Sequence, residues 1–452
     1  MYCFENKKRG SNVRILVISD VPWSEDNSVG NTYSNIFRNM ENVEFANLFF
    51  KPGKPNLKIL KKYYQMTEKK IIWNLIRKEN NMNETSDTKM EGSVGELNKK
   101  EQKIYDLLRS LRFPFLFIAR EFIWKVGKWK TKELDDFLQE FNPDIIFSFC
   151  LDSVYYANII DYCRKKTVSN TVLFFADDVY AYKRMNPLYL LHQYFVRKSI
   201  KRLASHCRLI YGATPELCSE YFNILKTKLI PLYKTCYDIP ETKTSNNTPL
   251  KMTYTGNLFY GRWKVLTLLS AAIKEINKDS IKIFLNIYTS GLYNQKMMKA
   301  LNKDNASCLR KGIPYDEVKK VLKESDIVVH VESFERKEIR KTRLSFSTKI
   351  VDCIQSGSCL LAIGPAEVAS ISMLRKHDIA EVITKNRKDD IKAALENILE
   401  NNNILIETSE RMKKYGLEYH SPEDLRVNLY NKLEELSKGD NNENNANKCS
   451  LS

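Results

Sequence analysis

The sequence predicts an α/β protein built from two domains, each a doubly wound parallel sheet. Short apolar runs rich in Val, Ile and Phe alternate with longer amphipathic segments through both halves of the chain, as strand–helix–strand units do. A polar segment with two prolines, residues 240–249, separates the halves and is predicted to be a linker. The length of 452 residues, 43% of them hydrophobic, is enough for two or three domains with sizeable cores.

The first domain is expected over residues 1–239. It opens with a strand at 13–19, and after a loop and a helix a second strand follows at 43–50. Residues 55–140 break the alternation and are predicted to form a basic helical insertion. The alternation then resumes, with strands at 143–149, 171–178 and 207–214 and helices at 188–206 and from Pro215.

The second domain, residues 250–407, repeats the same theme. Further helices are expected over residues 408–438, and the Asn-rich tail 439–452 is predicted to be disordered. The expected strands are 251–256, 281–289, 306–312, 326–331, 359–365 and 380–384. The expected helices begin near Trp263 and cover 295–303, 315–325, 345–357, 367–377 and 389–400.

The charge balance is strongly basic, with 72 Lys and Arg against 55 Asp and Glu, a net charge of +17. Residues 51–130 hold 19 basic and 9 acidic residues, so most of the excess belongs to one stretch. This predicts one basic surface and an anionic partner: nucleic acid, a phospholipid surface or a phosphate-bearing substrate. Nucleic acid is disfavoured because the chain has no recognisable nucleic-acid-binding module.

The ten cysteines are scattered without a CxxC pair, and several stand in apolar runs. They are expected to be buried thiols in a reducing compartment rather than a disulfide framework. The N-terminus lacks the apolar region of a signal peptide, and no window is apolar enough to span a membrane. We therefore expect a cytoplasmic protein.

Residues 255–264, TGNLFYGRWK, form the first candidate site. A strand ends at Gly256, and the loop through Asn257 leads to Arg262 and Lys264 near a helix N-terminus. Backbone N–H groups attract phosphate there, and two cations add charge-assisted bonds. The segment fits a pyrophosphate, although an ordinary solvated turn has the same composition.

The second candidate site follows the strand 326–331, whose end presents His330 and Glu332. The next helix is expected to begin among serines suited to capping, with Lys349 and Asp352 three residues apart on one face. Lys349 can meet phosphate, and Asp352 can accept hydrogen bonds from the two hydroxyls of a ribose. From spacing alone, a structural salt bridge with Ser and Thr caps is the favoured explanation of this pair, and a histidine here is more often packed than ligating.

Two weaker candidates belong to the first domain. Gly30 and Asn31 end the loop after the first strand, where a glycine would let the backbone approach a ligand closely. Asp177 and Asp178 end the strand TVLFFADD and could orient or deprotonate an acceptor hydroxyl. A plain turn and a helix N-cap are the alternatives.

Several enzyme classes are excluded by missing motifs. The sequence has no HExxH and its five histidines are dispersed, so no metal site is expected. It has no GxxxxGK[ST], which excludes a P-loop enzyme. It has no GxGxxG after the first strand, which disfavours a nicotinamide dehydrogenase.

Together these segments resemble the GT-B glycosyltransferases, most closely glycosyltransferase family 4, over most of the chain and best over residues 250–365. In that family a strand-end glycine followed by Arg and Lys grips the donor diphosphate, and Gly256, Arg262 and Lys264 match this pattern. Asp352, followed by QSG, matches the family's second acidic position, which holds the donor ribose.

The resemblance has a departure in the run SFSTKIVDCIQSG, which is similar to a variant with Ser–x–Lys in place of Gly–Phe–Gly–x–Pro. Leu344 stands where the family has its first Glu, and Glu332 and Arg343 are the candidates to replace it. The N-terminal VRILVISD and GNT resemble the family's opening strand and glycine loop.

The resemblance implies two facing Rossmann-like domains with a cleft between them, and a metal-independent, hexosyltransferase-like enzyme without a cofactor. Its donor substrate is a nucleotide-diphosphate sugar, and its acceptor is a glycan or lipid-linked hydroxyl, as in polysaccharide biosynthesis. A non-catalytic GT-B-like binding or scaffold subunit is the alternative. The candidate catalytic residues are Asp177, Asp178 and Glu332, and the donor-binding candidates are Gly30, Asn31, Gly256, Asn257, Arg262, Lys264, Arg343, Ser347, Thr348, Lys349 and Asp352.

The stretch RFPFLFIAREFIWKVGKWK mixes aromatic and basic residues in a way that suits a membrane headgroup interface. It predicts peripheral docking on the inner face of an anionic membrane, close to a lipid-linked acceptor. Packing of the aromatic residues in the first domain's core is the alternative. The residues concerned are Phe113, Phe115, Phe117, Phe122, Trp124 and Trp129 among Arg112, Arg120, Lys125, Lys128 and Lys130.

Overall fold

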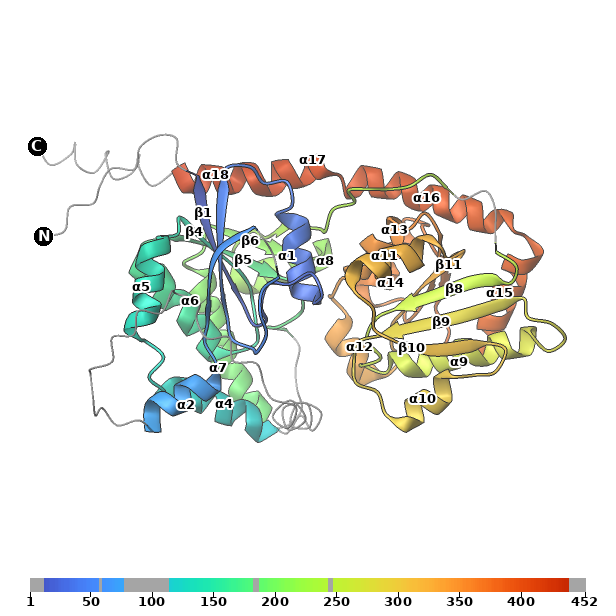
Figure 1. Ribbon diagram of the computed structural model, residues 1–452, viewed down its shortest axis with the longest axis horizontal. Coiled ribbons are helices and arrows are strands. Elements are labelled where there is room, and N and C mark those ends of the chain that lie inside the picture. The colour runs from blue at the N-terminus through green and yellow to red at the C-terminus, as the bar shows by residue number, and fades with distance from the viewer. Residues whose placement is uncertain (1–11, 57–58, 77–113, 182–186, 243–246, 439–452) are drawn as a thin grey trace, which may run out of the picture. The chain divides into compact units, whose positions relative to one another are not determined.

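The computed structural model describes residues 12–56, 59–76, 114–181, 187–242 and 247–438 (Figure 1). The chain forms two compact units. The first contains the chain up to Gly212, then Cys218–Pro231 and the residues from Val427; the second contains Ala213–Leu217 and Leu232–Arg426.

The first unit is built on a seven-stranded sheet in the order β3-β2-β1-β4-β5-β6-β7, with every neighbouring pair parallel. The order reverses between β1 and β4, as a doubly wound sheet requires. Its strands are β1 (Val13–Ser19), β2 (Val43–Phe49), β3 (Leu60–Gln65), β4 (Ile145–Phe149), β5 (Asn170–Phe175), β6 (Leu209–Gly212) and β7 (Ile230–Pro231).

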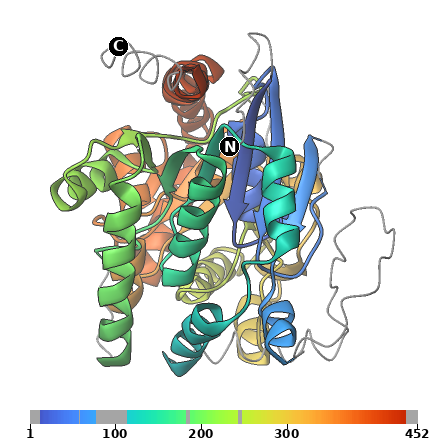
Figure 2. The same ribbon diagram turned by 90° about the vertical axis from the view of Figure 1, so that its left-hand side faces the viewer.

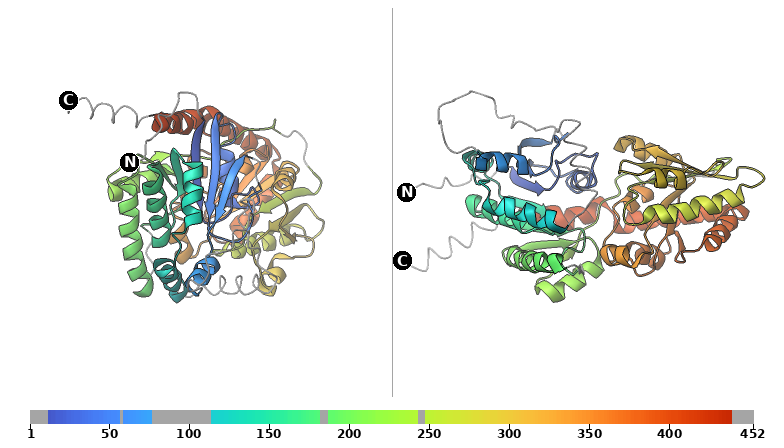
Figure 3. Two further views of the ribbon diagram at one scale, coloured as in Figure 1. Left: turned by 60° about the vertical axis from the view of Figure 1, so that its left-hand side comes forward. Right: turned by 90° about the horizontal axis from the view of Figure 1, so that it is seen from below.

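Helices cover this sheet, and Figures 2 and 3 show α5, α6 and α7 side by side in one layer. The last helix that the structure describes belongs to this unit, where Asn170 Nδ2 donates to the carbonyl of Leu436 at 3.0 Å. The helices are α1 (Ser28–Ile36), α2 (Glu68–Ile76), α4 (Pro114–Val126), α5 (Lys132–Phe141), α6 (Val154–Thr167), α7 (Pro187–Ala204), α8 (Pro215–Leu225), which begins in the second unit, and α18 (Asn431–Lys438), preceded by a π-helix (Arg426–Tyr430).

The second unit carries a six-stranded parallel sheet in the order β10-β9-β8-β11-β12-β13. The strands are β8 (Leu250–Thr255), β9 (Ile283–Thr289), β10 (Ser307–Lys311), β11 (Ile327–Val331), β12 (Cys359–Ile363) and β13 (Glu381–Ile383). The helices are α9 (Arg262–Ile276), α10 (Gln295–Leu301), α11 (Tyr315–Lys323), α12 (Arg336–Thr342), α13 (Lys349–Ile354), α14 (Ala369–Lys376), α15 (Lys388–Glu400), α16 (Asn403–Tyr419) and α17 (Pro422–Leu425).

Two hydrophobic cores lie on the two faces of this second sheet. Alternate residues of β11 point to opposite sides: Ile327 and Val329 pack with α9 and α15, whereas Val328 packs with α11, α13 and α14. Residues of β12 divide in the same way. Because both faces are covered, the strands are continuous apolar runs rather than alternating ones, which is why they are visible in the sequence.

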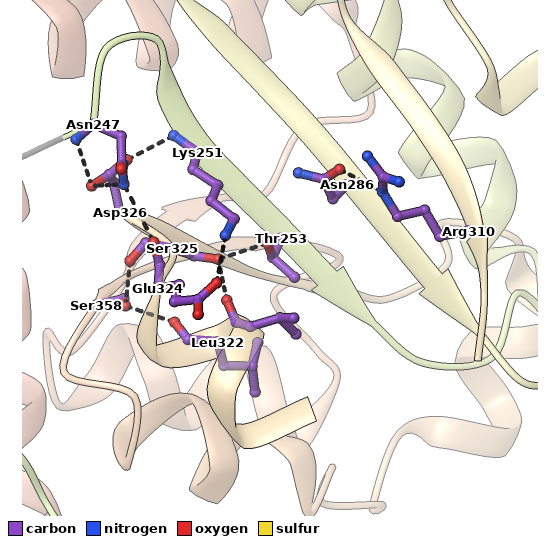
Figure 4. Close-up of polar contacts among 11 residues, drawn as sticks. Asn247, Lys251, Thr253, Asn286, Arg310, Leu322, Glu324, Ser325, Asp326 and Ser358 are labelled. Carbon is purple, nitrogen blue, oxygen red and sulfur yellow. Dashed lines mark hydrogen bonds and ion pairs between the residues drawn. The ribbon is translucent and has the colours of Figure 1, made fainter. Parts of the chain in front are cut away.

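A polar network closes the amino-terminal edge of this sheet (Figure 4). The buried carboxylate of Asp326 accepts hydrogen bonds from the backbone N–H of Lys251 at 2.7 Å and from the backbone N–H of Asn247 at 3.1 Å. The side-chain amide of Asn247 donates to the same carboxylate. Asp326 therefore fixes the chain that enters β8 against the start of β11. These contacts lie at the amino edge of the sheet and do not involve its carboxyl edge.

Three predictions about local structure are corrected. Residues 60–65 form β3 rather than part of a helical insertion, because they pair with β2. Gly30 lies inside α1, which begins four residues before the predicted start, capped by Asn27. The helix predicted over 345–357 is α13, only Lys349–Ile354, because the residues before it form a loop without a side-chain cap.

The observed division of the chain differs from the predicted one in three places. Ala213–Leu217, predicted to lie within the first domain, belong to the second unit. Residues 232–239, predicted to end the first domain, belong to the second unit. The helices predicted after residue 407 are shared: α16 packs on β12 and α13 in the second unit, whereas α18 belongs to the first. The predicted linker includes residues 243–246, and the predicted disordered tail is 439–452; both lie outside the described residues.

The aromatic and basic stretch before residue 130 divides between core and surface. Trp124 on α4 is buried, stacks on Tyr155 with ring centroids 4.6 Å apart, and donates from its indole N–H to Glu68. Phe122 on the same helix is 62% exposed. Arg112 and Phe113 lie outside the described residues, as does the side chain of Phe115. Among the described helices, none combines the length and hydropathy needed to cross a membrane.

We predict that Asp326→Ala lowers the free energy of unfolding by about 2–3 kcal/mol, because it leaves buried N–H donors without an acceptor. Urea denaturation followed by circular dichroism measures the change. The control is Glu324→Gln, which removes the surface ion pair with Lys251 Nζ at 3.0 Å and should change stability by less than about 1 kcal/mol. Equal effects of the two variants would contradict the role of Asp326.

Candidate functional site

The candidate site lies at the carboxyl edge of the second sheet, where β8 and β11 end side by side. The loop after β8 runs from Gly256 to Gly261, and α9 begins at Arg262. Glu332 follows the last residue of β11, and Lys349 is the first residue of α13. In doubly wound folds this edge is where ligands bind.

Arg262 and Glu332 form a buried ion pair. One Arg262 nitrogen, Nη2, lies 2.9 and 3.1 Å from the two carboxylate oxygens of Glu332, and Nη1 donates to Asn257 Oδ1 at 3.1 Å. The side chains are 14% and 4% exposed. The pair is charge-neutral, and Asn257 helps to hold the guanidinium in one position.

Lys349 is the unpaired cation of the site. Across the described part of the chain, no oxygen accepts a hydrogen bond or ion pair from its Nζ, which lies 5.7 Å from the ring centroid of Tyr254. A Cβ added to Gly256 would lie 1.9 Å from Nζ and 2.9 Å from the Tyr254 hydroxyl oxygen. A side chain at position 256 would therefore displace the lysine amine from its place along this loop.

The surroundings of the Lys349 amine disfavour its charged form. Burial, with Arg262 as the next largest cause, lowers the pKa of Lys349 to about 8. The ammonium form is thus less stable than in water, and an anion placed beside it would relieve this penalty.

His330, on β11, contributes no charge. Burial, followed by the nearby Arg262 and Lys349 cations, lowers the pKa of His330 to about 3, so the imidazole is neutral at pH 7. Its Nε2 lies 3.3 Å from the hydroxyl of Ser370. With Arg262 neutralised by Glu332, the site carries a net positive charge, concentrated at Lys349.

A small cavity brings Tyr254, Arg262, His330 and Lys349 together. Ser347, one of the predicted donor-binding residues, also contributes to its wall. It is lined by Tyr254, Thr255, Arg262, Val329, His330, Val331, Ser347, Lys349 and Cys353. A positively charged cavity at the carboxyl ends of parallel strands suits a phosphate group.

Other predicted donor-binding residues lie nearby with different contacts. Lys264 is exposed and pairs with Glu335. Thr348 precedes α13 but makes no side-chain capping bond. Arg343 ends α12, and its carbonyl accepts from the N–H of Ala369 at 2.8 Å. Leu344, at the sequence position where the resemblance places a Glu, is buried.

Asp352 does not line the cavity. Its Oδ1 accepts from Lys234 Nζ at 2.6 Å and from the hydroxyl of Tyr315 at 2.8 Å. Lys349 and Asp352, three residues apart on α13, therefore contact different neighbours in the structure. The role of Asp352 as a ribose ligand stays a prediction.

Lys234 and Tyr315 are the residues that sequence reasoning missed. The Lys234 side chain is 1% exposed and depends on Asp352 for its counter-charge. The only signal in the sequence is a lysine directly after the apolar run LIPLY. A lysine at the end of an apolar run is usually solvated, so its burial becomes visible only in the fold.

The candidates of the first unit have mainly structural contacts. Asp178 is buried, and its Oδ1 accepts from the N–H of Ala181 at 2.7 Å and the hydroxyl of Tyr221 at 2.9 Å. The carbonyl of Asp177 accepts from the N–H of Val179 at 3.0 Å. These bonds hold a turn after β5, and a role of either acid toward an acceptor stays a prediction.

Gly30 and Asn31 are both buried in the first turn of α1. A Cβ added to Gly30 would lie 2.2 Å from the carbonyl oxygen of Ser24. The missing side chain at this position thus leaves room for the loop that follows β1 in the same chain. Approach to a donor at these two residues stays a prediction. Across the described ranges of the chain, no three His, Cys, Asp or Glu side chains gather as metal ligands.

Solved structures show the same architecture. The structure of Anabaena HepE in complex with UDP and glucose matches with a TM-score of 0.58 at 9% identity, covering 94% of this chain and 100% of that chain. Sucrose-phosphate synthase from Thermosynechococcus elongatus matches with a TM-score of 0.59 at 9% identity, covering 94% of this chain and 99% of its own.

A third structure, a trehalose-6-phosphate protein from E. coli bound with UDP-2-fluoro glucose, has a TM-score of 0.54 at 9% identity, with coverage of 94% and 99%. No protein-family model and no curated protein sequence matches the chain. At this identity the likeness establishes the fold: two units with parallel sheets in the GT-B arrangement.

We predict that Lys349 loses its proton near pH 8 in the free protein, well below the usual value of about 10.4 for lysine. Acylation by a limiting amine reagent, followed by peptide mass spectrometry from pH 6 to 11, measures its titration. Arg262→Gln should raise this pKa, because it removes a neighbouring cation and leaves Glu332 unpaired. A midpoint unchanged from ordinary lysine would contradict the electrostatic description.

Proposed function

We propose that the protein is a glycosyltransferase, which moves a sugar from a nucleotide-diphosphate sugar to an acceptor hydroxyl. The observation that carries the proposal is the unpaired, half-buried Lys349 beside Gly256 and Arg262, at the carboxyl edge of a GT-B sheet. The names of the matching structures, which include UDP, UDP-glucose and UDP-2-fluoro glucose, support a donor of this chemical class.

In the proposed reaction the bond between the sugar and the diphosphate oxygen breaks, the sugar carbon bonds to the acceptor oxygen, and the proton of the acceptor hydroxyl passes to the leaving diphosphate. Negative charge develops on the leaving diphosphate, and Lys349 together with the N–H groups that begin α9 stabilises it. No divalent metal is needed in this scheme, because protein cations neutralise the leaving group. The reaction is hexosyl transfer, as the resemblance to family 4 implies.

Arg262 and Glu332 have different parts in this proposal. Arg262 retains donors that the Glu332 carboxylate does not use, since only Nη2 contacts that carboxylate. Glu332 is 4% exposed and committed to Arg262. We therefore assign Glu332 a positioning role for the guanidinium, rather than contact with the reacting atoms.

The acceptor is proposed to be a glycan or lipid-linked hydroxyl, as in polysaccharide biosynthesis, reached at an anionic membrane surface. Asp177 is the proposed group that orients this hydroxyl, because the Asp178 oxygen already accepts two hydrogen bonds. The alternative is a non-catalytic binding subunit, which the buried Leu344 at the position of the family's first Glu favours. Such a subunit would bind nucleoside diphosphate without cleaving a nucleotide sugar.

The experiment that tests donor binding is thermal denaturation with a panel of nucleotide sugars, nucleoside diphosphates and nucleosides. A ligand at about 100 times its dissociation constant adds about 2.7 kcal/mol to stability. We predict that Lys349→Met weakens nucleoside diphosphate binding at least about tenfold, as loss of a charge-assisted bond of about 1.5–3 kcal/mol requires.

Lys251→Met is the matched control, because it removes a lysine from the opposite edge of the same strand pair. Nucleoside affinity should be equal in both variants and the wild type. If no nucleotide in the panel raises the unfolding temperature, or if both variants bind nucleoside diphosphate alike, the proposed donor site is wrong.

Asp352 provides a separate test of the ribose prediction. Asp352→Asn should lower the affinity for ribonucleotides about tenfold, since an amide accepts weaker bonds from the two hydroxyls than a carboxylate does. Affinity for the 2′-deoxy analogue should change less. Tyr315→Phe removes one partner of Asp352 but keeps the carboxylate, and is the control for altered packing. Equal losses for ribose and deoxyribose ligands would assign Asp352 to the Lys234 ion pair alone.

A further inference from the structure

In the N-terminal half of helix α7, in the first unit, large apolar side chains are exposed and polar side chains are buried. Five large apolar or aromatic side chains there are between 46% and 61% exposed: Leu188, Leu190, Leu191, Tyr194 and Phe195. The side chains at His192 and Gln193 are instead buried. A helix on a water-exposed surface has the opposite pattern.

Polar contacts fix this orientation of the helix. His192 Nε2 lies 3.2 Å from Glu121 Oε1 of α4. The Glu121 carboxylate also accepts from the backbone N–H groups of Val154 and Tyr155, at 2.8 and 2.9 Å, and so caps α6. Rotating α7 to hide its apolar residues would break this set of bonds. The five apolar side chains, called here the α7 apolar face, therefore stay exposed.

Basic side chains follow this face along α7, and one of them, Arg202, pairs with Asp161 of α6 at 3.0 Å. The last two turns of α7 carry Arg197, Lys198, Lys201 and Arg202, and the helix contains no Asp or Glu. Lys125 follows on the adjacent α4, whose Phe117 ring packs on Tyr189 of α7 at 5.7 Å. Phe122 and Val126 of α4 are also exposed. An apolar helix end followed by a basic one matches a bilayer with anionic headgroups, in which rings and aliphatic chains enter the interface and cations meet phosphate.

We propose that the α7 apolar face docks the protein on an anionic lipid bilayer. The proposal deepens the proposed function by naming the surface that meets the membrane; it rests on that function only for the reason to dock, namely a lipid-linked acceptor. It also moves the predicted membrane contact from the basic stretch to the neighbouring helix α7, since Trp124 of that stretch is packed in the core.

The experiment measures flotation of the full chain with vesicles of phosphatidylcholine, alone or with about 30% phosphatidylglycerol, at about 0.1 M and about 0.5 M salt. We expect binding to the anionic vesicles at low salt, weaker binding at high salt, and little binding to neutral vesicles. The double variant L191S/F195S should bind at least about tenfold more weakly at both salt concentrations.

Two further variants separate charge from apolar contact. K198Q/K201Q should weaken binding about twentyfold at low salt, because each cation near the surface contributes about fivefold, and much less at high salt. Leu417→Ser is the matched control, since Leu417 on α16 is 61% exposed but belongs to the second unit. All these changes are on exposed side chains, so nucleoside diphosphate binding should persist and shows that each variant is folded.

The outcomes are distinguishable. No binding to anionic vesicles, or equal binding by L191S/F195S and Leu417→Ser, overturns the docking proposal and leaves the donor site untouched. Self-association that L191S/F195S abolishes, without vesicle binding, assigns the face to a second copy of this chain and also overturns it. Vesicle binding without any nucleotide binding overturns the proposed transferase function but supports the docking face.

Discussion

The ion pair between Arg262 and Glu332 is the interaction on which the electrostatics of the site depend. Burying either charge alone would cost several kcal/mol, and only close geometry with further hydrogen bonds compensates for it. Here Asn257 satisfies a second guanidinium nitrogen. Once this pair is neutral and His330 is uncharged, the remaining positive charge resides on Lys349, in a place where burial already disfavours the ammonium form.

The two edges of the parallel sheet in the second unit have different roles. Polar contacts at the amino edge stabilise the fold, whereas the carboxyl edge holds the candidate binding site. At the amino edge, Asp326 accepts hydrogen bonds from backbone N–H groups of the segment that enters β8. At the carboxyl edge, the loop from Gly256 and the starts of α9 and α13 leave a cation unpaired. The cores on both faces fix the strands, so the groups at the carboxyl edge are held before any ligand arrives. Such preorganisation is what charge stabilisation in catalysis requires.

The first unit shows how buried polar groups can determine what a surface displays. Glu121 caps α6 and holds His192, and this contact turns the apolar residues of α7 outward. In the same region Arg120 pairs with Glu68 and lies 4.8 Å from the Tyr155 ring centroid, beside the buried Trp124. Aromatic and basic residues that look alike in the sequence therefore divide between core packing and an exposed face.

The sequence by itself determined the fold class and the order of its elements. Strands buried on both faces must be continuous apolar runs, and the runs at 145–149, 327–331 and 359–363 are visible for that reason. It also predicted phosphate-binding residues in two separate segments, with Gly256 and Arg262 in the first and Lys349 in the second, and the structure brings the two segments to one edge of the sheet. The edge strand β3 was missed, since LKKYYQ is polar enough to resemble a helix.

Only the tertiary structure decided which partner each charge has. Spacing put Lys349 and Asp352 on one helix face, yet the amine contacts Gly256 and the carboxylate pairs with Lys234, 118 residues earlier in the chain. Glu332 was a catalytic candidate by position, and its bond to Arg262 spans 70 residues. Local periodicity describes neighbours along one element, whereas burial and ion pairing arise from long-range packing. A lowered lysine pKa and an outward-facing apolar helix are therefore properties of the folded chain alone.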